Sequence, residues 1–157
     1  MSGVVRTRRR TTVAGGGGLK AITTEYSPDY DESFPSTSSA SFTSIDVSTN
    51  ATIAVAAGDV LMIVFRGNFY LTAGNNVIGL DYNVNGGAAA MEGNGVPVEE
   101  VIPNASKHHL TYTDTYAVQP GDITAGETTV SALWKTGGSS LNVEDFQLTV
   151  INLRQVA

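Results

Sequence analysis

Histidine and carboxylate residues that could do chemistry occur in this sequence as adjacent pairs. His108 and His109 are the only histidines, and Glu99 and Glu100 stand together in a segment with a proline on each side. Neighbouring residues of a strand point to opposite faces, so the two histidines do not easily chelate one metal ion. General acid–base catalysis needs two carboxylates that converge on one cleft, and adjacency does not provide this. We therefore interpret both pairs as surface residues and expect no catalytic residues.

Two further segments have the residue types of a ligand site but lack its pattern. Residues 29–32 read Asp-Tyr-Asp-Glu, without the glycine and the distal glutamate of a calcium loop. The glycine run at 15–18 is not followed by the Lys-Ser/Thr of a phosphate-binding loop. The chain has no cysteine, which excludes disulfides and thiolate metal ligands. We expect no metal, no other cofactor and no enzymatic activity.

Charge is divided unevenly along the chain. The overall net charge is -6, yet the first twenty residues contain five basic residues and no acidic one. The rest of the chain contains fifteen acidic residues against four basic ones. A basic arm connected by four glycines to an acidic body favours attachment to a larger assembly. We predict that the basic residues of the arm bind a protein partner: Arg6, Arg8, Arg9, Arg10 and Lys20.

The predicted arm covers residues 1–41, and the predicted folded domain covers residues 42–157. Tyr26, Tyr30 and Phe34 interrupt a stretch rich in Ser, Thr and Pro, which is typical of an extended segment anchored by its rings. Four arginines could also neutralise phosphates, but the acidic body repels a polyanion and the basic segment has no aromatic residue for base stacking. We therefore expect a protein partner rather than nucleic acid, and a solvated tail is the alternative.

The spacing of apolar residues beyond residue 42 predicts an all-β protein. Val77–Val84 alternates as a half-buried strand, with Ile78, Leu80, Tyr82 and Val84 on the core face and Asp81 on the other face. Thr128–Lys135 alternates in the same way and places Trp134 in the core. Val60–Phe65 is apolar on both faces, as expected for a central strand of two packed sheets, and Gly67 predicts a bulge or corner. Turn residues recur between such segments, and residues 88–107 read as a loop. The fold class is an antiparallel β-sandwich or jelly roll with an extended N-terminal arm.

The basic start of the chain is not followed by an apolar region, and no stretch has the roughly 20 apolar residues of a membrane span. We expect synthesis in a cytoplasm without export by a secretory signal, and no membrane partner.

Three segments of the body resemble jelly-roll modules of tailed-phage virion proteins. They are GETTVSALWKTGGSSLNVEDFQLTVINLR at 126–154, AGDVLMIVF at 57–65 and VIGLDYNVNGG at 77–87. Such modules occur in head decoration, auxiliary capsid and fibre proteins. The sequence is also similar to the TNF/C1q-like jelly roll, which forms trimers through one broad face.

The resemblance implies a structural virion protein made in the host cytoplasm. Its expected form is a homotrimeric decoration or cement protein that docks on the major capsid protein, or on another virion protein, through the arm. The alternative is a receptor- or carbohydrate-binding module of a tail fibre or tail-associated protein. That alternative predicts an exposed aromatic cluster drawn from Tyr26, Tyr30, Tyr112 or Tyr116.

Overall fold

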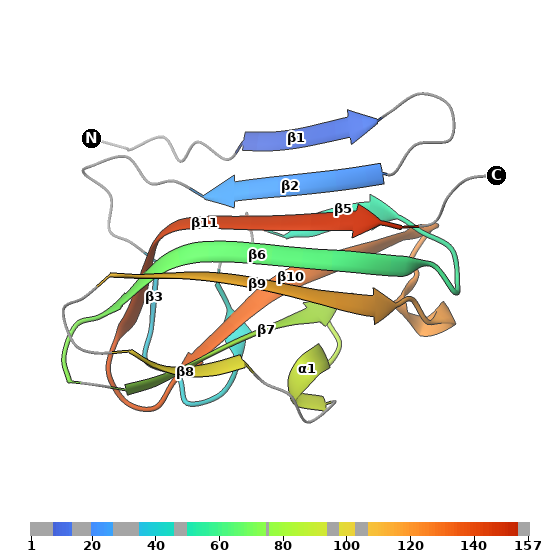
Figure 1. Cartoon of the computed structure of the whole chain (residues 1–157). Coiled ribbons are helices and arrows are strands. Elements are labelled where there is room, and N and C mark those ends of the chain that lie inside the picture. Colours follow the sequence, from blue (N-terminus) through green and yellow to red (C-terminus); the bar gives the residue numbers. More distant parts are fainter. Residues whose placement is uncertain are drawn as a thin grey trace, which may run out of the picture.

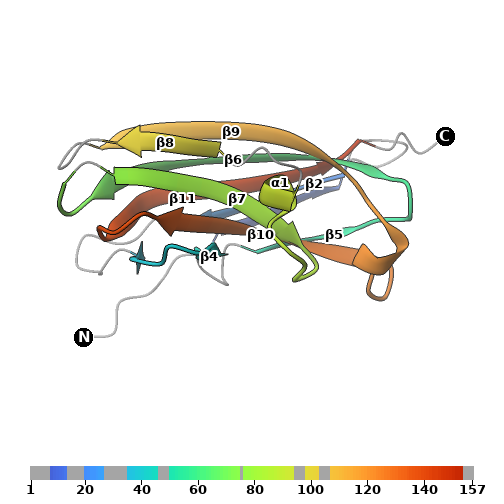
Figure 2. The ribbon, with the colours of Figure 1, turned by 90° about the horizontal axis from the view of Figure 1, so that it is seen from below.

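The chain folds into an antiparallel β-sandwich of jelly-roll type, which confirms the predicted fold class. This computed structural model describes residues 8–13, 20–26, 35–45, 50–74, 76–93, 98–102 and 107–153. The two sheets form two layers (Figures 1 and 2). Helix is confined to short turns in this part of the chain, and none of it is long and apolar enough to cross a membrane.

The first layer, sheet A, has six strands. In spatial order they are β1 (Arg8–Val13), β2 (Lys20–Tyr26), β11 (Leu141–Asn152), β6 (Val60–Leu71) and β9 (His108–Ala117), with β3 (Ser36–Thr37) also paired to β11. All described pairings are antiparallel. Sheet A faces the reader in Figure 1, with β1 and β2 along its upper edge.

The second layer, sheet B, has five strands. They are β4 (Thr43–Ser44), β10 (Glu127–Thr136), β7 (Asn76–Val84) and β8 (Val98–Ile102), with β5 (Ala51–Ala54) also paired to β10. A single helical turn, α1 (Ala90–Gly93), lies beside β7, and a 3-10 turn (Pro120–Asp122) follows β9. The predicted turn after β7 is present: Asn85 and Gly86 have positive φ angles of 50° and 75°.

The core lies between the two sheets and is built by the alternation of their long strands. Its largest fully buried side chains include Trp134 and Tyr82 from sheet B and Phe65, Phe69 and Phe146 from sheet A. Trp134 is 1% exposed, so the prediction that it is a core residue is confirmed. Each large side chain buried in this way contributes about 1.5–3 kcal/mol to stability.

The predicted interruption at Gly67 is found in the neighbouring strand instead. Strand β6 continues through Gly67, and the register shifts in β11 between Val143 and Phe146. A β-carbon at Gly67 would lie 2.9 Å from the Asp145 carbonyl oxygen and 2.8 Å from the Phe69 ring. Glycine is needed there because the bulged strand approaches the backbone of β6 closely.

Residues 88–107, predicted as a loop, contain α1 and β8, and α1 changes the environment of β7. Alternation places Ile78, Leu80, Tyr82 and Val84 in the core, as predicted, but Asp81 on the opposite face is fully buried as well. The Asp81 Oδ1 atom accepts hydrogen bonds from the backbone nitrogens of Tyr82 (2.6 Å) and Met91 (3.0 Å). The buried carboxylate therefore ties α1 to β7, whereas the alternation of the sequence alone suggests that Asp81 faces solvent.

Strands β1 and β2 lie within the segment predicted to be an arm. Their extended conformation agrees with the prediction, but they pair with the body: β2 runs along β11 from Lys20 opposite Asn152 to Tyr26 opposite Phe146. Strand β3 also precedes residue 42. The described part of the arm therefore widens sheet A, while the domain boundary at residue 42 remains a prediction.

Candidate functional site

The predicted docking residues are divided between strands β1 and β2 and the segments around them. Arg8, Arg9 and Arg10 begin β1, with Arg8 opposite Glu25 in the pairing. Lys20 begins β2 at the other end of this hairpin, opposite Val13, and Tyr26 ends it. The backbone thus separates Lys20 from the arginine run. Arg6, Tyr30 and Phe34 lie outside the described residues.

Beside this hairpin, the outer face of sheet A has a cluster of apolar side chains that we call the apolar half. Met62 on β6 lies directly opposite Ile151 on β11, and both are partly exposed. Val60 and Leu153 extend the cluster toward the end of the sheet with exposed fractions of 39% and 36%. Val64 completes it. The sequence predicted a central strand with apolar residues on both faces, and β6 does lie between β11 and β9. Sheet B covers its inner face.

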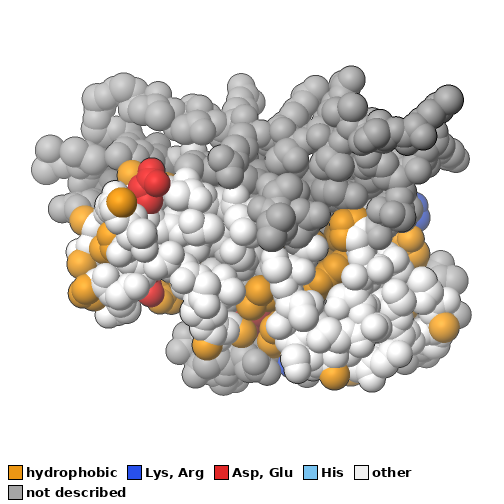
Figure 3. All heavy atoms as spheres, turned by 180° about the vertical axis from the view of Figure 1, so that it is seen from behind, with side chains coloured by type: hydrophobic (Ala, Val, Ile, Leu, Met, Phe, Trp, Pro, Cys, Tyr) orange, Lys and Arg blue, Asp and Glu red, His pale blue; other side chains and the backbone are white. Residues whose placement is uncertain are grey.

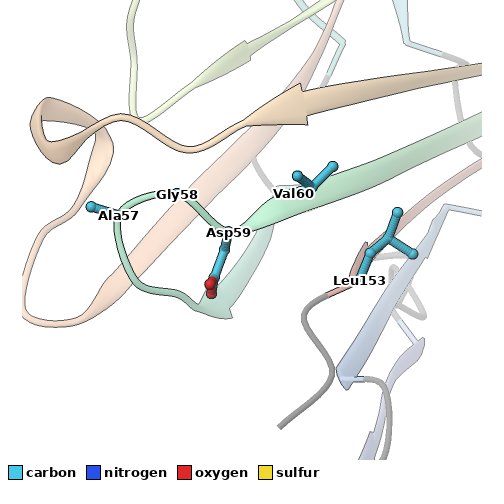
Figure 4. A pocket seen from close by; sticks show the side chains of 5 residues that line it. All are labelled: Ala57, Gly58, Asp59, Val60 and Leu153. Atoms are coloured by element: carbon cyan, nitrogen blue, oxygen red, sulfur yellow. The ribbon is translucent and has the colours of Figure 1, made fainter. Parts of the chain in front are cut away.

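The apolar half ends at an open hollow of about 480 Å³. It is lined by Ala57, Gly58, Asp59, Val60 and Leu153. Figure 4 shows the Val60 and Leu153 side chains on neighbouring strands, with the Asp59 carboxylate pointing the opposite way. The Asp59 Oδ2 atom accepts hydrogen bonds from Asn152 Nδ2 (2.8 Å) and from the backbone nitrogen of Ala56 (2.9 Å). This carboxylate therefore holds the 56–59 turn in place, and Val60 and Leu153 form the apolar side of the hollow.

The other half of the same face is polar, and the β11 bulge organises it. Two bulge residues, Glu144 and Asp145, stand opposite the single residue Asn68 of β6. The Asp145 carboxylate contacts Asn68, and the Glu144 carboxylate contacts Lys107, which precedes β9. Lys107 Nζ forms an ion pair with Glu144 Oε2 at a distance of 2.6 Å. This hydrogen bond raises the pKa of Lys107. We call this region the bulge cluster; its members are Arg66, Asn68, Lys107, His109, Thr111, Glu144 and Asp145.

A chain of hydrogen bonds crosses the bulge cluster from β11 to β9. Asn68 Nδ2 donates to Asp145 Oδ2 at 3.2 Å, and the Asn68 Oδ1 atom is 3.0 Å from His109 Nδ1. On the other side of the imidazole, His109 Nε2 is 3.3 Å from the Thr111 hydroxyl. Three strands thus hold four polar side chains in one connected arrangement on an exposed surface.

The tyrosines that the sequence singled out point between the sheets rather than into solvent. The ring of Tyr112 packs edge-on against Phe65 with centroids 4.7 Å apart, and Tyr116 meets Tyr82 at 6.2 Å. The Tyr82 hydroxyl donates to Asp114 at 2.7 Å. The predicted exposed aromatic cluster is therefore wrong for Tyr112 and Tyr116. Of the other two candidates, Tyr30 lies outside the described residues and Tyr26 ends β2.

Burial controls the ionisation of these phenols. Desolvation, followed by the hydrogen bond to Asp114, raises the pKa of Tyr82, and desolvation also raises the pKa of Tyr112. Desolvation and a 2.9 Å hydrogen bond to Asp122 raise the pKa of Tyr116 to about 12. All three phenols stay protonated at neutral pH, and the Tyr82 and Tyr116 hydroxyls donate hydrogen bonds to Asp114 and Asp122.

The histidine pair lies on β9 with its side chains on opposite faces, as predicted: His108 is half-buried and His109 is exposed. Glu99 and Glu100 belong to β8 rather than to the predicted loop. In the described residues, no group of three or more His, Asp or Glu side chains could hold a metal ion.

The outer face of sheet B has no hydrogen-bonded cluster comparable to the bulge cluster among the described residues. Seen from behind, it shows few charged side chains among the described residues, with hydrophobic ones near the middle (Figure 3). Lys135 of β10 places its ammonium group 4.4 Å from the centre of the Phe42 ring. Val77 of β7 and Val101 of β8 lie opposite each other and are 38% and 64% exposed, so sheet B also has an exposed apolar pair.

Solved structures that align with the chain share its fold. A protein of T=1 particles derived from infectious bursal virus aligns with a TM-score of 0.53 and 13% identity over 85% of this chain. A protein of the T13 viral particle of the same virus aligns with a TM-score of 0.52 and 12% identity over 85% of this chain. The chain spans about a third of the length of these proteins, 32% and 31%.

A xylan-binding domain, CBM22-1 of Paenibacillus barcinonensis Xyn10C, aligns over 98% of this chain and 85% of its own, with 14% identity and a TM-score of only 0.33. Neither a protein-family model nor a curated protein matches the sequence. The comparisons therefore establish a jelly-roll fold like that of the two viral-particle proteins.

Proposed function

We propose that this chain is a structural component of a virus particle, a decoration or cement protein that attaches to the shell through its N-terminal segment. The observation that carries the proposal is the continuity of sheet A. Strand β2 pairs with β11 from Lys20 to Tyr26, so Lys20 lies at the Asn152 end of the sheet, beside the apolar half. The arginine run of β1 begins at Arg8, opposite Glu25, and therefore lies toward the Gln147 end, beside the polar half. Cationic and apolar contacts are thus available on adjacent parts of one sheet.

The jelly-roll fold supports a role in a particle, because it is the fold of the two viral-particle proteins. The resemblance of residues 126–154 to tailed-phage modules supports a phage virion as its location. The partner in this proposal is the major capsid protein or another virion protein with acidic surface patches. A catalytic role is not part of the proposal.

Attachment in this proposal is multivalent. The apolar half joins three copies into a trimer, and each copy contributes one basic segment. Exposed ion pairs contribute only about 0–1 kcal/mol each, so one segment holds weakly. Three linked segments hold much more tightly, because after the first contact the others bind at a high effective concentration.

The test compares two four-fold variants of Arg6, Arg8, Arg9 and Arg10 in binding to particles assembled without this chain. Substitution of all four by Gln should reduce the bound copies several-fold at physiological salt. Substitution of all four by Lys keeps the charge and should retain most of the binding. Equal occupancy for wild type and the Gln variant would remove the segment from the mechanism. Loss of DNA binding alone would favour a nucleic-acid partner.

A further inference from the structure

The bulge cluster has a fixed direction of hydrogen bonding. The amide nitrogen of Asn68 donates to Asp145, so its oxygen faces His109 and accepts from the Nδ1 hydrogen. In the neutral imidazole, Nε2 is then the acceptor and takes the hydrogen of the Thr111 hydroxyl. The two contacts of the His109 ring therefore orient it, and an incoming ligand meets donors and acceptors that are already in position.

The charges of the cluster balance. Arg66 and Lys107 supply two positive charges, and Glu144 and Asp145 supply two negative ones. The ion pair between Lys107 and Glu144 at 2.6 Å neutralises one of each locally. A strongly anionic ligand would meet the carboxylates, and a cationic ligand would meet Arg66 and Lys107. The surface therefore suits a ligand without net charge that both donates and accepts hydrogen bonds.

Hydroxyl groups of sugars have this chemistry. Adjacent sugar hydroxyls pair well with planar carboxylate, amide and guanidinium groups, and all three kinds are present in Asp145, Asn68 and Arg66. Tyr70 follows Asn68 on the same face of β6 and is partly exposed, which gives the apolar face of a sugar ring an aromatic surface to contact. The bulge matters because it brings the β11 carboxylates to the side of β6.

We propose that the bulge cluster is a binding site for a neutral oligosaccharide, with Asn68, His109 and Asp145 as its central hydrogen-bonding residues. The site lies on the polar half of sheet A and uses none of the arm residues. It would give the protein a glycan-binding function in addition to attachment to a particle.

Saturation-transfer NMR on the isolated full chain tests the proposal, with maltohexaose, cellohexaose and mannohexaose as neutral probes and a sulfated heparin hexasaccharide as the anionic probe. At least one neutral probe should show transfer. Asn68→Ala combined with His109→Ala should weaken that probe's binding about tenfold or more, and Asp145→Asn should weaken it severalfold. The matched control is Thr113→Ala with Thr115→Ala on the same face of β9, which should leave binding unchanged.

The variants must keep the wild-type circular dichroism spectrum and cooperative melt. Absence of transfer to every neutral probe would overturn the proposal, as would equal binding by the Asn68/His109 variant, or binding of the heparin probe alone. The assay contains no particles, so its failure would leave the attachment function untouched, and failure of the particle assay would leave the glycan site untouched.

Discussion

The outer face of sheet A has an apolar half and a polar half, and the same strands, β6 and β11, form both. In the apolar half, β6 and β11 pair in regular register and present Met62 and Ile151 opposite each other. In the polar half, the bulge in β11 breaks this register and brings Glu144 and Asp145 beside Asn68. Regular pairing gives a flat surface suited to another protein surface, whereas the bulge gives an uneven, hydrogen-bonded surface suited to a small polar ligand.

The largest effect on self-association is expected when the apolar half is made polar. Met62→Lys with Ile151→Glu keeps the net charge and allows a cross-strand ion pair, so the fold should persist. Loss of two apolar side chains from each interface should weaken self-association about a hundredfold or more. Multi-angle light scattering at micromolar concentration should change from a trimer mass to a monomer mass.

The matched control makes an equivalent exchange in the polar half. Arg66 and Gln147 also lie opposite each other on β6 and β11, and Arg66→Gln with Gln147→Lys, which also keeps the net charge, should leave the trimer intact. A monomeric wild type, or a trimer that survives the Met62/Ile151 exchange, would show that the apolar half is not a self-association surface.

A smaller effect is expected from removing the space that the bulge needs. In Gly67→Ala the new β-carbon meets the Asp145 carbonyl and the Phe69 ring at less than 3.0 Å, so the bulge must shift. We expect a loss of about 1–3 kcal/mol in the free energy of unfolding, together with loss of glycan binding. Urea unfolding measures the first. Gly121→Ala, with nothing within 4 Å, should change stability by less than about 0.5 kcal/mol. Equal stability of the two variants would mean that β11 does not approach β6 closely at Gly67.

The smallest expected effect is a change in the pH dependence of stability caused by Tyr116, which lies on the inner side of β9. Burial and the hydrogen bond to Asp122 raise the pKa of Tyr116 to about 12, above the value of about 10 for an unfolded tyrosine. The folded chain therefore keeps this proton where the unfolded chain loses it. The resulting stability is fully present below pH of about 10 and is lost as pH rises toward about 12.

Urea unfolding across this alkaline range should show a steeper decline for wild type than for Tyr116→Phe, which has no phenol to titrate at this position. Identical slopes for the two proteins would show that Tyr116 ionises equally in both states.

Much of the fold could be predicted from local pattern. Alternation along Val77–Val84 and Thr128–Lys135 locates two core strands, and Trp134 is buried as predicted. The strands β1, β2 and β8 were missed because their sequences have no clear alternation, and pairing with a neighbouring strand determines their conformation. Asp81 lies on the predicted face of β7, but its burial was missed because it depends on the packing of α1, whose backbone nitrogen at Met91 donates to the carboxylate.

The bulge cluster could not be found from spacing. Asn68 is 41 residues from His109 and 77 residues from Asp145, and only the register of β6 with β9 and β11 brings them together. Gly67 was the one local signal, since a glycine within a strand pattern indicates close backbone approach. A resemblance of short segments predicts the fold type, while a site formed by register needs the three-dimensional pairing.

The central claim is that sheet A, with its basic hairpin, faces the rest of a virus particle. The most direct measurement is cryo-electron microscopy of the purified particle at side-chain resolution, with the position and copy number of this chain determined. We expect trimers in which Met62 and Ile151 are buried between copies and the arginine run contacts an acidic shell surface. A particle in which sheet B makes the contacts while Met62, Ile151 and the arginine run face solvent would contradict the account, as would the absence of this chain from the particle.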